Sequence, residues 1–282
     1  MVSTLSAVFI VTGAASGVGF EFARILYLKS ATVYIAARSI GRADGAIKKL
    51  EALLPGSTGR LVPLAIDLAD LTSIKPAVER FLSRESRLDG LIHNAGVMEP
   101  PVGSKNKHGH DLEIGTHCLG PFVLTNLLKD TLAATAKTTP AFSVRVIWVA
   151  SLLSLGPPPG GMVFNDKGGP EPITKVFPNY MQSKVGETWL ACDFAAHLEQ
   201  HKVMSVSVIF KPAVYGAYTE LYATFSPKVK PENTEGKYVM AWGRLEPLPK
   251  DVTDGLRSVQ AGGSGKAAMF WEYCERETAA YL

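Results

Sequence analysis

Cysteine is scarce in this chain, which has three in 282 residues. Cys118, Cys192 and Cys274 are far apart, and no two of them form a Cys-x-x-Cys pair. A disulfide framework uses an even set of cysteines and a zinc ribbon uses closely spaced pairs, so the sequence favours neither. We therefore expect a protein held together by its hydrophobic core in a reducing compartment, the cytoplasm.

Long apolar runs and a strong charge of one sign are also missing. No stretch reaches the ~18 apolar residues that cross a membrane, and no basic segment precedes the apolar residues 7–11. The 29 basic and 26 acidic residues give a formal net charge of +3, too little for a nucleic-acid surface. Lys105–Asp111 contains two histidines, but its polar setting predicts a solvated loop, and we expect no metal site.

The chain alternates short β-branched runs with longer segments of helical spacing, and hydrophobic residues make up 46% of it. Such alternation predicts an α/β fold, a doubly wound parallel sheet with helices on both faces, within a single domain of residues 1–282. The expected strands are Ala7–Val11, Thr32–Ala36, Leu61–Ile66, Leu88–His93, Val144–Val149 and Met204–Phe210. The expected helices are Val18–Leu28, Ala43–Leu54, Ser73–Ser83, Gly109–Ala136 and Asn179–His201.

Two later segments stand apart from this pattern. Gly156–Pro172 contains five glycines and five prolines, which predicts a long irregular loop at the carboxyl edge of the sheet. We assign residues 152–178 to a substrate-loop region. The tail at 244–282 follows a short strand, Lys237–Trp242, and is expected to form two helices separated by Gly262–Gly265. The apolar face of the last helix predicts packing on the core.

A glycine motif closes the first strand and opens the first helix. Gly13, Gly17 and Gly19 bracket Ser16 and Val18, a spacing that gives a tight turn and free N–H groups at a helix start. In this strand–helix context the motif predicts a pyrophosphate-binding turn.

The ends of the next strands refine the expected ligand. The second strand ends at Arg38 where an acidic residue would bind a ribose 2′-hydroxyl, and a guanidinium fork suits a 2′-phosphate instead. NADP(H) is therefore favoured over NAD(H). Asp67 and Leu68 follow the third strand and are expected at the adenine. The small residues after the fourth strand would let the adenine ribose lie close: Asn94, Ala95 and Gly96.

Together with Tyr180-Met181-Gln182-Ser183-Lys184, these ordered motifs resemble the short-chain dehydrogenase/reductase family over nearly the whole chain. Three further segments resemble the fungal retinol-dehydrogenase-like members: Trp148–Ser151, Gly216–Tyr222 and Trp271–Thr278. The resemblance implies a Rossmann fold, a role in secondary metabolism, and homodimers or homotetramers built on helices 109–136 and 179–201.

The expected chemistry centres on Tyr180 and Lys184, which share a helix face at a spacing of four. A free tyrosine has a pKa of about 10, and a nearby ammonium favours the phenolate. Tyr180 is thus the candidate general acid/base, and Lys184 is also expected to hold the nicotinamide ribose. Ser151 can hydrogen-bond the reacting carbonyl oxygen; Ser154 is a second candidate that matches the family position less well.

The sequence departs from the family at two places. His117 stands where the family has an asparagine of a proton relay, so it either holds the relay water, loses the relay, or is simply packed. After the sixth strand the family has Pro-Gly, a threonine and a lid. Either Pro212-Ala213 replaces Pro-Gly with Thr219 displaced, or the lid is absent and residues 216–223 form the helix beyond it. We favour the second, with the pocket open or closed by Gly156–Pro172.

The first functional hypothesis is an NADP(H)-dependent oxidoreductase that interconverts a ketone or aldehyde and an alcohol on a hydrophobic small molecule. The alternative is a family-derived scaffold with lost or altered redox activity, such as a non-redox cyclase, an isomerase or a metabolite-binding protein. A protein that only senses the cofactor ratio is a third alternative, which the retained Ser151, Tyr180 and Lys184 disfavour.

Overall fold

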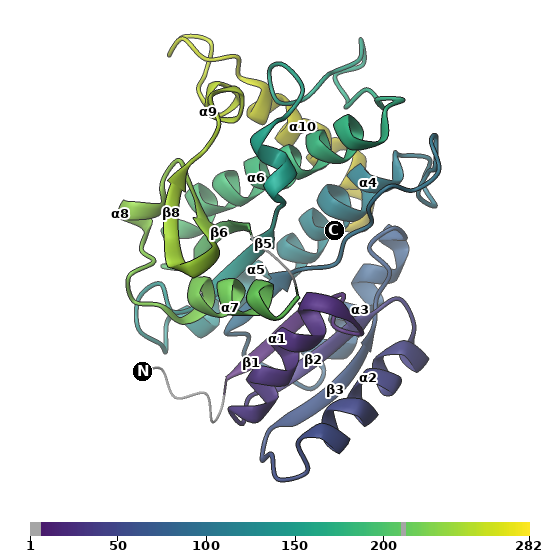
Figure 1. The fold of residues 1–282 in the computed structure, drawn as a ribbon, viewed down its shortest axis with the longest axis vertical. Helices are drawn as coiled ribbons and strands as arrows, with labels where there is room; N and C mark the ends of the chain where they lie inside the picture. Colours follow the sequence, from purple (N-terminus) through teal and green to yellow (C-terminus); the bar gives the residue numbers. More distant parts are fainter. Residues whose placement is uncertain (1–6, 210–212) are drawn as a thin grey trace.

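The computed structural model describes residues 7–209 and 213–282, and its sheet has eight strands in the order β3-β2-β1-β4-β5-β6-β7-β8 (Figure 1). The strands β1 to β7 pair in parallel, and β8 pairs antiparallel with β7. The strands are β1 (Val8–Thr12), β2 (Thr32–Ala37), β3 (Arg60–Ala65), β4 (Gly90–His93), β5 (Arg145–Val149), β6 (Met204–Ile209), β7 (Lys237–Met240) and β8 (Arg244–Pro247).

The doubly wound parallel sheet that the sequence predicts is confirmed. All six expected strands are present with ends displaced by two residues or fewer, except that Phe210 lies outside the described residues. The strands form where apolar β-branched runs are buried on both faces, and every residue of β1 and β6 is buried. The chain winds outward from β1 to β3 and returns to β4 beside β1, which opens a crevice at their carboxyl ends.

Helices cover both faces of the sheet, each over its own apolar core. One core includes side chains of α1, α2 and α7, and the other includes side chains of α3, α5, α6 and α10. The helices are α1 (Gly17–Leu28), α2 (Ile40–Leu53), α3 (Ile74–Leu82), α4 (Leu112–Ile114), α5 (Gly120–Ala136), α6 (Val176–Glu199), α7 (Ala213–Phe225), α8 (Pro231–Thr234), α9 (Lys250–Leu256) and α10 (Lys266–Thr278).

The expected helix 109–136 is interrupted. Between α4 and α5 the residues Gly115–Leu119 form a π-helical turn. Such turns are rare and occur frequently at functional sites, because the extra residue changes where side chains point. This turn is fully buried and contains Thr116, His117 and Cys118.

The C-terminal tail forms the two expected helices, α9 and α10, and adds the edge strand β8, which the proline turn concealed in the sequence. Phe270, Tyr273 and Cys274 of α10 are buried, as predicted for packing on the core. Trp271 lies with its ring centroid 4.9 Å from that of Phe122 in α5 and 4.9 Å from that of Phe194 in α6. Helix α10 therefore occupies part of the face that the family resemblance assigns to an oligomer interface.

The prediction of a solvated loop at Lys105–Asp111 is wrong for its two histidines. His110 Nδ1 is 3.2 Å from the Tyr273 hydroxyl, and His108 Nδ1 is 2.9 Å from the Tyr281 hydroxyl. His108 Nε2 also accepts a hydrogen bond from the backbone N–H of Leu71. Contacts with the tail thus partly bury the two histidines, while Lys105, Lys107 and Gly109 stay exposed.

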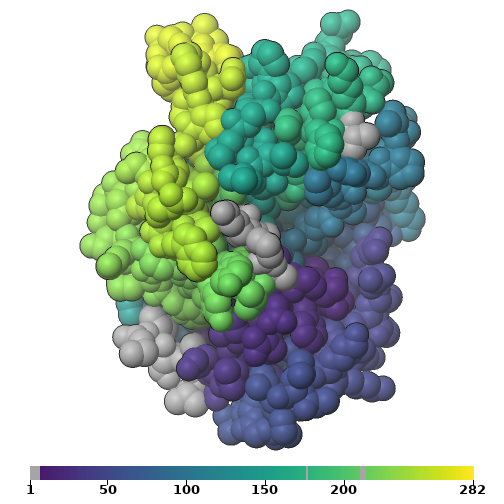
Figure 2. Space-filling view, in the orientation of Figure 1, coloured from purple at the N-terminus to yellow at the C-terminus, as the bar shows by residue number. Residues whose placement is uncertain are grey.

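The loop Gly156–Pro172 is irregular, as predicted, but it packs on the tail helices. Met162 is fully buried, and its carbonyl accepts a hydrogen bond from Lys266 Nζ at the start of α10. The Gly160 N–H donates to the Asp251 carboxylate of α9. Figure 2 shows this teal segment beside the yellow tail at one end of the molecule.

No helix in the described parts of the chain is long and apolar enough to cross a membrane.

Candidate active site

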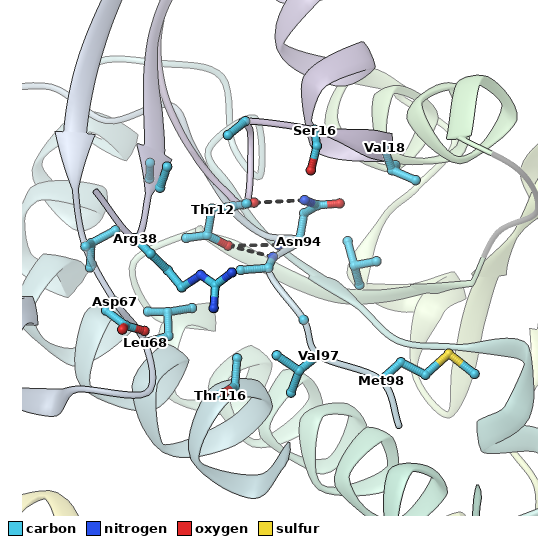
Figure 3. A pocket seen from close by; sticks show the side chains of 18 of the residues that line it. Thr12, Ser16, Val18, Arg38, Asp67, Leu68, Asn94, Val97, Met98 and Thr116 are labelled. Atoms are coloured by element: carbon cyan, nitrogen blue, oxygen red, sulfur yellow. Dashed lines mark hydrogen bonds between the residues drawn. The ribbon is translucent and has the colours of Figure 1, made fainter. Parts of the chain in front are cut away.

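A cleft of about 450 Å³ lies at the carboxyl ends of β1 and β4 (Figure 3). Of the site residues expected from the sequence, all except Gly17, Gly19 and His117 line it. The lining residues that were expected are Gly13, Ser16, Val18, Arg38, Asp67, Leu68, Asn94, Ala95, Gly96, Ser151, Tyr180 and Lys184. Residues far apart in sequence therefore meet at one crevice.

The turn after β1 has the backbone geometry that the glycine motif requires. Gly13 and Gly17 have φ of 69° and 60°, in the left-handed region that side chains disfavour. A Cβ added at Gly19 would lie 2.4 Å from Asn94 Nδ2, which packs against this first turn of α1. Asn94 Nδ2 donates to the Thr12 carbonyl at 2.8 Å and so ties the ends of β1 and β4 together.

The start of α1 is left open to a ligand. Ser16 is the N-cap residue, but its side chain makes no capping hydrogen bond, and no acidic residue lies in the first turn. The N–H groups at a helix start carry partial positive charge and bind anions. The turn therefore fits a pyrophosphate.

Two arginines line the cleft beyond β2. Arg38 points into it on the same side as Asp67 and Leu68 in Figure 3. Arg42 lines it as well, because Ser39 caps α2 and places Arg42 in the first helical turn. Sequence reasoning missed Arg42, although its spacing of four from Arg38 was a usable signal. Two guanidinium groups that line one cleft suit a phosphate monoester.

Thr116 is a second lining residue that sequence reasoning missed. It is 7% exposed, and its Oγ1 has no hydrogen-bond partner among the described residues. A buried hydroxyl without a partner costs free energy unless a ligand satisfies it. The open helix start, the two arginines that line the cleft and this hydroxyl together fit a phosphorylated dinucleotide.

The expected catalytic residues Ser151, Tyr180 and Lys184 line the same cleft. Ser151 follows β5, and its Oγ accepts a hydrogen bond from the Leu153 N–H, which leaves the hydroxyl proton for another acceptor. Tyr180 on α6 is 9% exposed and lines the same cleft. Lys184 Nζ lies 5.8 Å from the centre of the Tyr180 ring. Ser154 is buried, and its hydroxyl donates to the Ser151 carbonyl, so it is held beneath the site.

Lys184 is held by two hydrogen bonds in the protein interior. Its Nζ donates to the Val149 carbonyl at 2.9 Å and to Glu187 Oε2 at 2.7 Å. Burial lowers the pKa of this ammonium, but Glu187, Tyr180 and Cys118 together act in the opposite direction, and the pKa of Lys184 lies above its usual value. Lys184 therefore stays charged.

His117 is packed and satisfied, the third of the expectations for this residue. Its Nε2 accepts a hydrogen bond from the Val97 N–H, and its Nδ1 is 2.8 Å from Ser183 Oγ, which itself donates to the Tyr180 carbonyl. This pattern fixes the neutral tautomer with the proton on Nδ1. Burial also holds the pKa of His117 well below its usual value. With both nitrogens engaged, the ring orients the loop after β4.

Only three residues separate the end of β6 at Ile209 from the start of α7 at Ala213. That is too short for the lid helices expected from the family, so the interpretation of an absent lid is favoured. Pro212 of the other interpretation lies outside the described residues. Thr219 does not line the cleft; it is buried in α7, and its hydroxyl donates to the Tyr215 carbonyl. The Gly156–Pro172 loop does not line the cleft either, so its expected closing role is not supported.

Comparison with known proteins agrees with this geometry. A family model described as short chain dehydrogenase matches residues 7–165. Short-chain dehydrogenase/reductase bet4 of Neocamarosporium betae is 37% identical over 309 aligned residues, which cover 98% of this chain and 87% of that protein. The chain belongs to the short-chain dehydrogenase/reductase family. A short-chain dehydrogenase/reductase of Phomopsis amygdali is 38% identical, over 99% of this chain and 91% of that protein.

The alignment with the Neocamarosporium relative spans 309 positions, whereas this member of the family has 282 residues. That relative therefore carries segments that this chain lacks. Among solved structures, an uncharacterized protein of Mycobacterium paratuberculosis is similar with a TM-score of 0.67 and 25% identity, over 97% of this chain and 93% of that one. A metagenomic short-chain oxidoreductase in complex with NADP has a TM-score of 0.62 and 23% identity, over 79% and 92%.

Proposed function

We propose that this short-chain dehydrogenase/reductase is an NADP(H)-dependent oxidoreductase that interconverts a ketone or aldehyde and an alcohol on a hydrophobic small molecule. One observation carries the proposal: Ser151, Tyr180 and Lys184 line the same cleft as Arg38 and Arg42. Ser151 follows β5 and Arg38 follows β2, and β1 and β4 lie between these two strands in the sheet. The bound cofactor would supply or accept the hydride.

The cofactor would be held along the whole cleft. Arg38 and Arg42 suit the 2′-phosphate, and the turn from Gly13 to Gly17 suits the pyrophosphate. Asp67 and Leu68 lie where the adenine is expected, and Thr116 offers its unpaired hydroxyl nearby. Lys184 has one N–H donor beyond its two hydrogen bonds, which suits a ribose hydroxyl.

The substrate carbonyl oxygen would lie between the Ser151 and Tyr180 hydroxyls. Ser151 donates a hydrogen bond that polarises the carbonyl, and Tyr180 donates the proton in the reductive direction. A second, smaller cavity of about 90 Å³ is lined by residues 100–104 and 172–174 and by the polar side chains of Asp111, Glu113 and Asn179. We place the apolar part of the substrate against the proline, valine and isoleucine side chains of these two segments and against Met98, and the second segment belongs to the expected substrate-loop region.

The test is the rate of NADPH oxidation with a panel of hydrophobic ketones and aldehydes. Tyr180→Phe removes the general acid and is expected to lower the rate about 10²-fold or more. Tyr218→Phe is the matched control, because Tyr218 lies on α7, is half exposed and is absent from the cleft lining. Retained turnover in Tyr180→Phe would contradict the proposal. If the wild-type protein binds the cofactor but turns over no carbonyl compound, the non-redox scaffold is favoured. Location in the cytoplasm and homo-oligomerisation belong to the same proposal.

A further inference from the structure

Lys184, the lysine of the proposed active site, forms a buried ion pair with Glu187. Lys184 and Glu187 are 4% and 1% exposed, and Lys184 Nζ is 2.7 Å from Glu187 Oε2. The two residues are three apart on α6, so they share a helix face. Glu187 does not line the cleft, whereas Lys184 does. The Glu187 carboxylate therefore affects a ligand in the cleft only indirectly, through the charge and the position of the Lys184 ammonium.

The charge of this pair changes near neutral pH. Burial raises the pKa of Glu187 to about 7, although the Lys184 ammonium beside it acts in the opposite direction. Lys184 stays protonated in the same range, because pH 6 to 8 lies well below the usual ammonium pKa of 10.5 and the ionised Glu187 carboxylate raises the Lys184 pKa further. Below pH 7 the pair thus carries one positive charge, and above pH 7 it is neutral overall.

Most other titratable groups near the pair keep one protonation state around pH 7, and the remaining carboxyl, Glu113, can be tested by substitution. Burial holds the pKa of His117 well below its usual value, and it raises those of Cys118 and Tyr238, so all three are uncharged near pH 7. Glu113 also interacts with Lys184, and burial raises its pKa. The groups that face the pair are His117 and Cys118 of the π-helical turn, Glu113 of α4, Tyr238 of β7 and Tyr180 of α6 itself.

We propose that Glu187 is a positioning residue that sets the net charge behind the nicotinamide end of the cleft, and thereby the preference of the site for reduced over oxidised cofactor. The inference rests on the proposed function, because it needs NADP(H) in the cleft. The nicotinamide ring is cationic in NADP⁺ and neutral in NADPH. An unopposed Lys184 ammonium repels the cationic ring, and an ionised Glu187 removes most of that repulsion.

The sign of the effect follows directly. At pH 6 Glu187 is mostly protonated, so the ratio of the NADP⁺ dissociation constant to the NADPH dissociation constant is high. At pH 8 Glu187 is ionised and the ratio falls. One unit charge in a partly solvated cleft is expected to change the ratio about threefold to tenfold. The 2′-phosphate also titrates, with a second pKa of about 6, but it is common to both nucleotides and cancels in the ratio.

The test measures both dissociation constants by fluorescence titration of the full chain between pH 5.5 and pH 8.5. The wild-type ratio is expected to fall as the pH rises through 7. Glu187→Gln keeps the side-chain shape without the charge, so its ratio is expected to stay at the high, low-pH value throughout. Glu187→Asp keeps a carboxylate and should restore the fall. Glu113→Gln is the matched control, since it replaces another buried carboxyl near Lys184 that forms no ion pair with it.

Each outcome decides something. A wild-type ratio that does not change with pH overturns the role of Glu187 and requires no variant. A pH-dependent ratio that persists in Glu187→Gln also overturns the role of Glu187. If that dependence disappears in Glu113→Gln, the titrating carboxyl is Glu113. If neither nucleotide binds the wild-type protein, the proposed function fails, and this inference fails with it.

Discussion

The buried carboxyl of Glu220 on α7 is expected to make the free energy of unfolding depend on pH. Its side chain is fully buried, and neither carboxylate oxygen has a hydrogen-bond partner among the described residues. Burial raises the pKa of Glu220 from the usual 4.5 to about 8. An ionised carboxylate without a partner in an apolar interior is costly, so the folded protein keeps this group protonated.

The direction and size of the effect follow from linkage. Because the folded-state pKa is raised, the contribution of Glu220 to stability is complete below pH 4.5 and is lost as the pH rises to 8. The slope is about 1.4 kcal/mol per pH unit, so about 4 kcal/mol is lost between pH 5 and pH 8. Glu220→Gln removes this loss. For a chain of this size the variant should gain about 8 °C in melting temperature relative to wild type over that range.

The assay is thermal or urea unfolding of both proteins at pH 5, 6.5, 8 and 8.5. Glu51→Gln is the control, because it makes the same substitution at an exposed position on α2. Parallel pH curves for wild type and Glu220→Gln would refute the reasoning. A variant that is less stable than wild type at pH 8 would show that the native carboxylate is ionised and paired.

Two further substitutions test the site and the tail. Gly19→Ala places a Cβ 2.4 Å from Asn94 Nδ2 and should displace the link between β1 and β4, so we expect lost nucleotide binding in a fluorescence titration; unchanged binding would contradict the tight fit of this turn. Trp271→Ala removes the ring that packs on Phe122 and Phe194, and should lower the free energy of unfolding by about 3 kcal/mol in urea. A loss below ~0.5 kcal/mol would mean that α10 contributes little to the core.

Much of the fold could be predicted because apolar runs and motif spacings can be read from short stretches of the sequence. Six of the seven parallel strands lie in short, mostly apolar runs, and the motif residues follow strands whose carboxyl ends meet at one edge of the sheet. The glycine turn, Arg38 and the pair Tyr180 and Lys184 therefore reached the cleft as expected. The Lys184–Glu187 spacing was visible too, but the burial that gives the pair its importance depends on the packed structure.

The remaining features depend on tertiary contacts that a sequence pattern does not encode. Thr116 reaches the cleft through a π-helical turn, a change of helix phase with no clear signal in the sequence. His108 and His110 are half-buried only because the tail returns to them. The glycines and prolines of Gly156–Pro172 predict an irregular loop, but its packing on the tail depends on where α9 and α10 lie.

Binding of NADP(H) in the cleft through Arg38 and Arg42 can be measured by thermal-shift titration with NADPH, NADP⁺, NADH and NAD⁺. A ligand that binds only the folded state adds about 2.7 kcal/mol at a hundredfold excess over its dissociation constant, or about 5 °C here. We expect that shift for NADPH and NADP⁺ alone, its loss in Arg38→Gln, and its retention in the surface control Arg84→Gln. Equal shifts with NADH and NAD⁺, or an unchanged NADPH shift in Arg38→Gln, would contradict this expectation.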